Sequence, residues 1–91
     1  MMNNDLISSL KSMKDGVKVE ETLKNGECKY IEIEKLRINT YLKNKKQYIE
    51  LISKGMVEYI IDLSKSLRIR DSKLGDIWIF EEDKTILITV L

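Results

Sequence analysis

The sequence predicts an α+β fold in the order α-ββ-α-ββ, with an antiparallel sheet of about four strands and the helices packed on one face. Three observations lead to this prediction: apolar residues at helical spacing near the N-terminus and across the middle, a hairpin pattern between them, and two β-rich segments at the C-terminal end. The 91 residues correspond to one domain, 1–91. With 43% hydrophobic and 34% charged residues, the chain has the composition of a folded globular protein.

The first element is a predicted short helix over about residues 5–14. Asn3, Asn4 and Asp5 are residue types that favour a helix N-cap, and Asp15-Gly16 is a typical stop. The apolar residues between them recur at helical spacing: Leu6, Ile7, Leu10 and Met13.

A β-hairpin follows, with its turn at residues 24–27. A two-residue Asn25-Gly26 loop would pair Val19 with Glu32 and would mix the faces. A loop longer by one residue, with Gly26 in a left-handed bulge, pairs Val19 with Ile31. Because side chains alternate strictly along strands, the bulged turn is the predicted one.

The middle of the chain carries an apolar stripe with steps of three, four and seven residues: Ile38, Leu42, Ile49, Ile52, Met56, Ile60, Leu63 and Leu67. This spacing predicts helix. A single helix over the stripe would be about 45 Å long at ~1.5 Å per residue, against roughly 30 Å for a compact domain of this size. We therefore expect a short helix near 35–42 and a main helix over 45–67, capped by Asn44 and bent at Gly55.

The remaining third reads as a loop followed by a second hairpin. Residues 68–76 contain Asp, Ser and Gly and predict the loop. Strands are expected over 77–80 and 85–90, joined by a turn at 81–84, with Trp78 in the core. The last strand is apolar on both faces, which indicates a central or well-covered strand.

Charge is unevenly distributed along the chain. Residues 1–34 carry a net charge of −2, residues 35–75 of +6, and residues 76–91 of −3. Cations and tyrosines of the basic middle are the candidate partner-binding residues: Tyr41, Lys43, Lys45, Lys46, Tyr48, Arg68, Arg70 and Lys73. They would contact phosphate or an acidic protein surface, while the alternative interpretation is a solvated helix face.

The sequence favours binding over catalysis. It has no histidine, no Gly-rich phosphate loop and no recognisable nucleophile motif, so we predict that it is not an enzyme and needs no cofactor or metal. The acidic turn at 81–83 lacks the ligand spacing of a calcium loop. Cys28 is the single cysteine, which indicates a reducing compartment, and no apolar run reaches the ~20 residues of a membrane span. We expect a half-buried Cys28 and a cytoplasmic protein, in a bacterium or an infected host cell.

The N-terminal third resembles a known family. Asn4-Asp5-Leu6-Ile7, a lysine at Lys11 or Lys14, Asp15, Val17-Lys18, Ile31 and Ile33 are similar to the start of small phage-encoded anti-CRISPR proteins. The resemblance implies a phage or mobile-element protein that inhibits a type II CRISPR nuclease, with a helix, then strands, then helix. Those inhibitors are strongly acidic DNA mimics that end in helix. This chain has a net charge of +1 and a basic middle, so DNA mimicry is not expected.

The leading hypothesis is a small protein-binding inhibitor or accessory factor directed at a host protein or ribonucleoprotein complex, acting by steric occlusion. The alternative is a nucleic-acid-binding module that uses the basic central helix. A homo-oligomer built through the long helix or an exposed edge strand is the third hypothesis, and no membrane association is expected.

Overall fold

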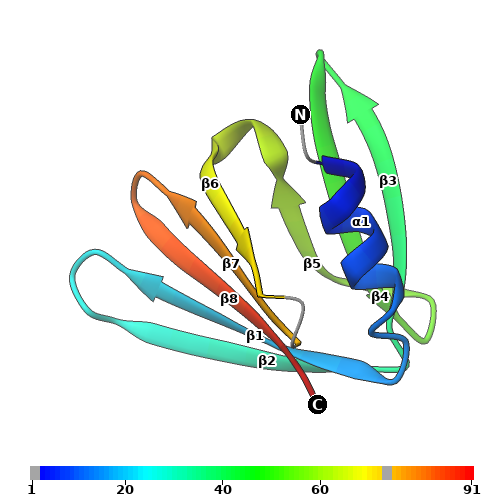
Figure 1. Cartoon of the computed structure of the whole chain (residues 1–91). Helices are drawn as coiled ribbons and strands as arrows, with labels where there is room; N and C mark the ends of the chain where they lie inside the picture. Colours follow the sequence, from blue (N-terminus) through cyan, green and yellow to red (C-terminus); the bar gives the residue numbers. More distant parts are fainter. Residues whose placement is uncertain (1–2, 73–74) are drawn as a thin grey trace.

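The computed structural model describes residues 3–72 and 75–91, and in these ranges the chain is mostly β-structure with one α-helix. The predicted α+β fold is therefore wrong. Eight antiparallel strands form two sheets, and the helix α1 (Asn3–Lys11) lies beside the smaller one (Figure 1). The molecule measures 31 × 29 × 25 Å, which is too short for the 45 Å helix that the apolar stripe implied.

The five-stranded sheet has the strand order β2-β1-β8-β7-β6. Its members are β1 (Gly16–Leu23), β2 (Cys28–Glu34), β6 (Ser66–Asp71), β7 (Asp76–Glu81) and β8 (Lys84–Val90). Val19 pairs with Ile31 and Gly26 has φ +92°, so the predicted bulged hairpin is confirmed. The last strand, β8, is central as predicted, between β1 and β7.

The three-stranded sheet, in the order β3-β4-β5, replaces the predicted helices. Its strands are β3 (Arg37–Lys43), β4 (Lys46–Ser53) and β5 (Met56–Asp62), followed by the 3-10 turn η1 (Leu63–Lys65). The predicted helices over 35–42 and 45–67 are thus wrong. Val, Ile, Thr and Tyr are frequent in these segments, and such residues fit a pleated sheet better than a helix.

Two tight turns explain why this region folds as hairpins. Asn44 and Lys45 have φ values of +53° and +65°, and Lys54 and Gly55 have +52° and +78°. Positive φ at both central residues is what a type I′ turn requires, and its twist matches that of paired strands. Asn44 and Gly55, expected to cap and bend a helix, are turn residues instead.

Burial follows a period of two and contradicts the helical stripe. Ile49, Leu51 and Ile61 are fully buried, whereas Leu42, Met56 and Leu67 from the stripe are exposed. Strands with one buried face alternate in this way, and a helix would not. Ile49 and Leu63 from the stripe are buried, but its helical spacing also placed four exposed residues inside: Leu42, Met56, Ile60 and Leu67.

The predicted loop over 68–76 is also corrected, because β6 continues to Asp71 and pairs with β7. Arg68, Ile69 and Arg70 are thus strand residues, with Ile69 facing the core. After β6, the Ser72 N–H donates to the carbonyl of Asp76 at the start of β7.

The core lies between the inner faces of the two sheets and is closed at one side by α1. The helix contributes Leu6 and Leu10 to the core, as predicted. It ends at Lys11 and not near residue 14, so Met13, expected in its last turn, is buried just after it. Trp78 was expected in the core but is half-buried on the outer face of β7, because Ile77 and Ile79 take the inward positions. In the described ranges no helix is long and apolar enough to cross a membrane.

Candidate protein-binding surface

The basic cluster at residues 43–46 lies at the tip of the β3–β4 hairpin. Lys43 pairs directly with Lys46, and Lys45 sits in the turn between them. All three side chains are exposed. The sequence grouped these three lysines at the start of a helix, whereas the structure places them at a hairpin tip.

Two tyrosines stack next to this tip, one from each strand of the hairpin. Tyr41 and Tyr48 are cross-strand partners, with ring centroids 5.2 Å apart and an interplanar angle of 17°. Desolvation, with a smaller contribution from the Glu50 carboxylate, raises the pKa of Tyr41. Its hydroxyl group therefore stays protonated at neutral pH and can donate a hydrogen bond to a partner.

Apolar side chains occupy the other end of the same outer face. Glu50 pairs with Ile60, and Ile52 pairs with Val57, so Ile52, Val57 and Ile60 lie together. Val57 is 47% exposed and Ile60 48%. Glu50, between them and the tyrosines, accepts a hydrogen bond of 3.0 Å from the Asn39 side chain. We call the set Tyr41, Tyr48, Ile52, Val57 and Ile60 the tyrosine face.

Arg68 and Arg70, two further candidate residues, do not join this surface. They lie on β6, at the edge of the five-stranded sheet. The Arg68 guanidinium stands over the Phe80 ring at 4.3 Å from its centroid, and Phe80 stacks with Trp78 at 6.1 Å. The structure therefore divides the predicted set between two sheets. Lys73, the last candidate residue, lies outside the described residues.

The outer face of the five-stranded sheet uses its side chains within the protein. Lys18 forms an ion pair of 3.0 Å with Glu20 and stands 4.6 Å from the Tyr30 ring centroid. The hydrogen bond that the Lys18 ammonium donates to the Glu20 carboxylate raises the pKa of Lys18. On this face the Arg68 guanidinium likewise lies over the Phe80 ring.

A cluster of three polar side chains, Tyr59, Glu21 and Lys84, links the two sheets at the end of the core away from α1. The Tyr59 hydroxyl donates to Glu21 at 2.5 Å, and the Lys84 ammonium lies 3.3 Å from the same carboxylate. Burial raises the pKa of Tyr59, so it stays a neutral donor. These groups satisfy one another, which indicates a structural role.

The sequence predicted neither a catalytic site nor a metal site. In the described ranges, no group of three or more His, Cys, Asp or Glu side chains could hold a metal ion. Cys28 is exposed rather than half-buried, because it lies on the outward-facing side of β2, at the turn end of the hairpin and opposite the exposed Thr22.

Sequence reasoning missed the apolar half of the tyrosine face. Ile52 and Ile60 were assigned to the helical stripe and hence to the core, and Val57 was not singled out. The signal that could have found them is the alternation from Ile49 to Ile61 on either side of Lys54-Gly55, a dipeptide that suits a two-residue turn.

Comparison of the chain with models of protein families, with curated proteins and with solved structures finds no match in any of the three.

Proposed function

We propose that this protein is a non-catalytic binding factor that docks another protein on its tyrosine face. The observation that carries the proposal is the half-exposed Val57 and Ile60 beside Ile52 and the stacked Tyr41–Tyr48 pair. Contiguous exposed apolar groups are typical of interaction sites, and tyrosine is enriched at interfaces.

The partner that fits this surface has an apolar centre and an acidic rim. Lys43, Lys45 and Lys46 border the tyrosine face at one end, so acidic groups of the partner would meet them there. Apolar groups would cover Val57 and Ile60. Binding of this kind would act by steric occlusion, as an inhibitor or accessory factor does.

The similarity of the N-terminal third to phage-encoded anti-CRISPR proteins supports a host defence complex as the partner class to test first. Beyond the N-terminal third the two folds differ, because this chain continues in β-strands where those proteins are helical. Cys28, the single cysteine, supports a reducing compartment such as the cytoplasm for this encounter.

The alternative hypothesis, nucleic-acid binding, relied on a basic central helix. That segment forms β3, β4 and β5 instead. Lys43, Lys45 and Lys46 alone offer few phosphate contacts, and Arg68 is already placed over Phe80. Self-association through the tyrosine face is a competing outcome of the binding experiment.

The test compares capture of host proteins by the wild type, by Ile60→Glu and by Thr22→Glu. Thr22 is exposed on the outer face of the five-stranded sheet and is the matched control. We expect a defined partner with wild type and Thr22→Glu, lost by more than tenfold with Ile60→Glu, and released by salt. Equal capture by all three proteins, or a wild type that associates only with itself, would contradict the proposal.

A further inference from the structure

β2 is the outermost strand of the five-stranded sheet (Figure 1), and β5 is an edge strand of the other sheet. Two adjoining cavities, of about 200 and 270 Å³, are each lined by residues of both strands, and Glu58 borders both. We call the space between the two strand edges the edge groove. Its principal residues are Tyr30, Ile31, Glu32 and Glu34 of β2 and Glu58 and Tyr59 of β5. None of them belongs to the tyrosine face.

The backbone of β2 presents hydrogen-bonding groups along this groove. The Leu23 N–H donates to the Glu27 carbonyl across the hairpin, and in an antiparallel ladder bonded pairs alternate with non-bonded ones. The bonds to β1 therefore fall on odd-numbered residues of β2, such as Ile31. The N–H and C=O groups of Tyr30 and Glu32 point the other way, and in the described part of the chain β2 has no strand on that side. Such groups can pair with one more strand.

The free part of this edge is bounded at both ends. The Ser53 hydroxyl donates to the Glu34 carbonyl at 2.6 Å, so that acceptor is already in use. At the other end β2 begins at Cys28, next to the hairpin turn. An added strand can thus exchange backbone hydrogen bonds with Tyr30 and Glu32, which limits it to a short extended segment.

The inward side of the groove is apolar. Ile31 faces the interior, with Val19 as its cross-strand partner on β1 and Tyr59 across the groove on β5. The cavity of about 200 Å³ beside these three residues admits one aliphatic side chain. A strand added to β2 would direct the side chain opposite Ile31 into this cavity, because paired residues point to the same side of a sheet.

The charge of the groove indicates a basic occupant. Its second cavity is lined by three carboxylates, Glu32, Glu34 and Glu58, and by one cation, Lys54. In the described ranges none of these carboxylates forms an ion pair. Carboxylates along a free edge oppose pairing with the same edge of a second copy, whereas they attract lysine and arginine side chains.

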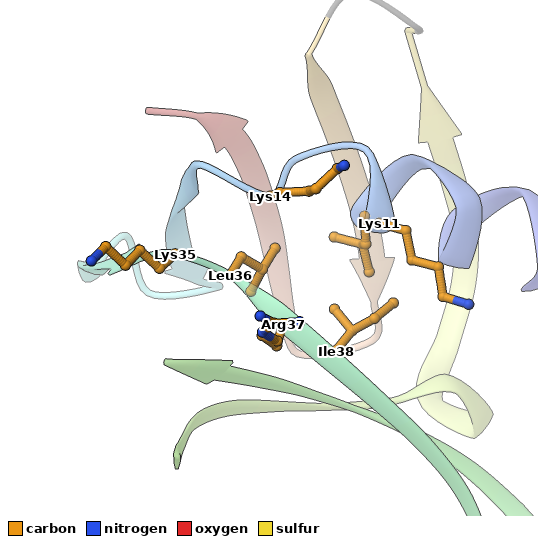
Figure 2. Close-up of a pocket in the computed structure, with 7 residues that line it drawn as sticks. Lys11, Lys14, Lys35, Leu36, Arg37 and Ile38 are labelled. Carbon is orange, nitrogen blue, oxygen red and sulfur yellow. The ribbon is translucent and has the colours of Figure 1, made fainter. Parts of the chain in front are cut away.

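The hollow between α1 and β3 offers no comparable combination. Lys11, Lys14 and Arg37 border it, but Figure 2 shows their side chains ending in different directions. Arg37 also pairs with Ile52 on the outer face of the three-stranded sheet. These cations do not converge on one ligand, whereas the edge groove combines backbone groups, an apolar cavity and carboxylates.

We propose that the edge groove binds a basic, extended peptide segment of a partner protein, which adds to β2 as a further strand. Its backbone pairs with Tyr30 and Glu32, and its lysine or arginine side chains lie beside Glu32 and Glu34. Because side chains alternate along a strand, the segment alternates basic and aliphatic residues, with one aliphatic side chain in the cavity next to Ile31. This site is separate from the tyrosine face and does not depend on it.

The test is an NMR titration of the ¹⁵N-labelled full chain at low salt with the peptide acetyl-KVKVK-amide. We expect saturable shifts at Tyr30, Glu32 and Glu58. Hydrogen exchange of the Tyr30 and Glu32 amides should slow on binding, whereas the Ile31 amide, already bonded to β1, should change little. Shifts that never saturate, or slower exchange caused by a higher concentration of the protein alone, would overturn the proposal.

A modified peptide separates strand addition from attraction by charge. The sequence of the probe is the same in both directions, so its central lysine lies opposite Glu32 whichever way the strand runs. An N-methyl group on that lysine keeps the charge but removes the backbone donor, and should weaken binding at least tenfold. Equal affinity of the two peptides would overturn the proposal.

Protein variants test the role of the carboxylates. Glu32→Gln/Glu58→Gln should weaken binding of acetyl-KVKVK-amide at least fivefold. The control Glu82→Gln/Asp83→Asn removes the same charge at exposed positions between β7 and β8, and should change binding by less than twofold. Equal losses in the two variants would show attraction to any acidic surface and would overturn the proposal.

Discussion

On the outer face of the five-stranded sheet the large and charged side chains contact one another, whereas on the outer face of the three-stranded sheet Val57 and Ile60 remain about half exposed. Lys18 engages Glu20 and Tyr30, and Arg68 covers Phe80. Both sheets are antiparallel and bury one face in the same core. Tyr41 and Tyr48 also contact each other, so what separates the two faces is the adjacent pair of exposed aliphatic side chains, Val57 and Ile60, on the three-stranded sheet.

The difference shows where a partner can gain binding energy. Groups that already contact one another must give up those contacts before they bind something else, whereas exposed apolar groups lose only water. The tyrosine face is therefore the better docking surface, even though the five-stranded sheet is larger and carries Arg68 and Arg70.

The largest expected effect is the difference in stability loss between a variant on the buried face of the three-stranded sheet and a variant on its outer face. Leu51→Ala should lower the free energy of unfolding by about 2–5 kcal/mol, because Leu51 is fully buried. Ile60→Ala should lower it by less than about 1 kcal/mol, because Ile60 lies on the outer face. Urea unfolding measures both changes in stability. A larger loss for Ile60→Ala would mean that Ile60 lies in the core, as the helical interpretation required, and would contradict the strand arrangement.

A smaller effect is expected where the two sheets meet through Tyr59 and Glu21. Tyr59→Phe should lower stability by about 2 kcal/mol at pH 7, because a hydrogen bond to a carboxylate is lost. Tyr48→Phe is the matched control, since in the described ranges the Tyr48 hydroxyl makes no hydrogen bond.

The same pair predicts a pH dependence. Burial opposes ionisation of Glu21, but the hydrogen bond from Tyr59 and the charge of Lys84 outweigh it and lower its pKa below the usual 4.5. A lowered pKa in the folded state stabilises the fold above about pH 4.5, and this stability is lost as the pH falls further. The difference in unfolding free energy between wild type and Tyr59→Phe should therefore shrink at pH 3.

Burial raises the pKa of Glu81, which acts in the opposite direction but equally in both proteins. A difference that grows on acidification would contradict this account.

The smallest predicted change in stability has a sign that distinguishes a turn from a helix at position 45. Lys45→Gly should stabilise the protein by up to about 1 kcal/mol, because Lys45 has φ +65° and glycine adopts that conformation without strain. In a helix the same substitution would destabilise by about 1 kcal/mol. Thermal unfolding decides between them, with Lys46→Gly, on strand β4, as a control expected to destabilise.

The sequence predicted the two ends of the chain well and the middle wrongly, for physical reasons. Around Val19 and Ile31 the alternation and the glycine turn agree, so the register could be derived. Between Ile38 and Leu67, apolar residues lie on both faces of the strands, and their combined positions imitate a helical period. Asn44-Lys45 and Lys54-Gly55 carry the true signal, but a lysine at positive φ is an unusual turn residue.

The candidate surface was predicted in part. Tyr41, Tyr48, Lys43, Lys45 and Lys46 come together because a hairpin pairs residues symmetrically about its turn, and residues near that turn are also close in the sequence. Arg68 and Arg70 follow them in the sequence but belong to the other sheet, which no local pattern reveals.

The central claim is that a protein partner covers the tyrosine face and leaves the outer face of the five-stranded sheet free. The most direct measurement places a photo-cross-linking amino acid at position 60 in one protein and at position 22 in another, with the captured partner and mass spectrometry as the readout. We predict a covalent adduct from position 60 and none from position 22. Adducts from position 22 alone, or equally from both, would contradict the claim.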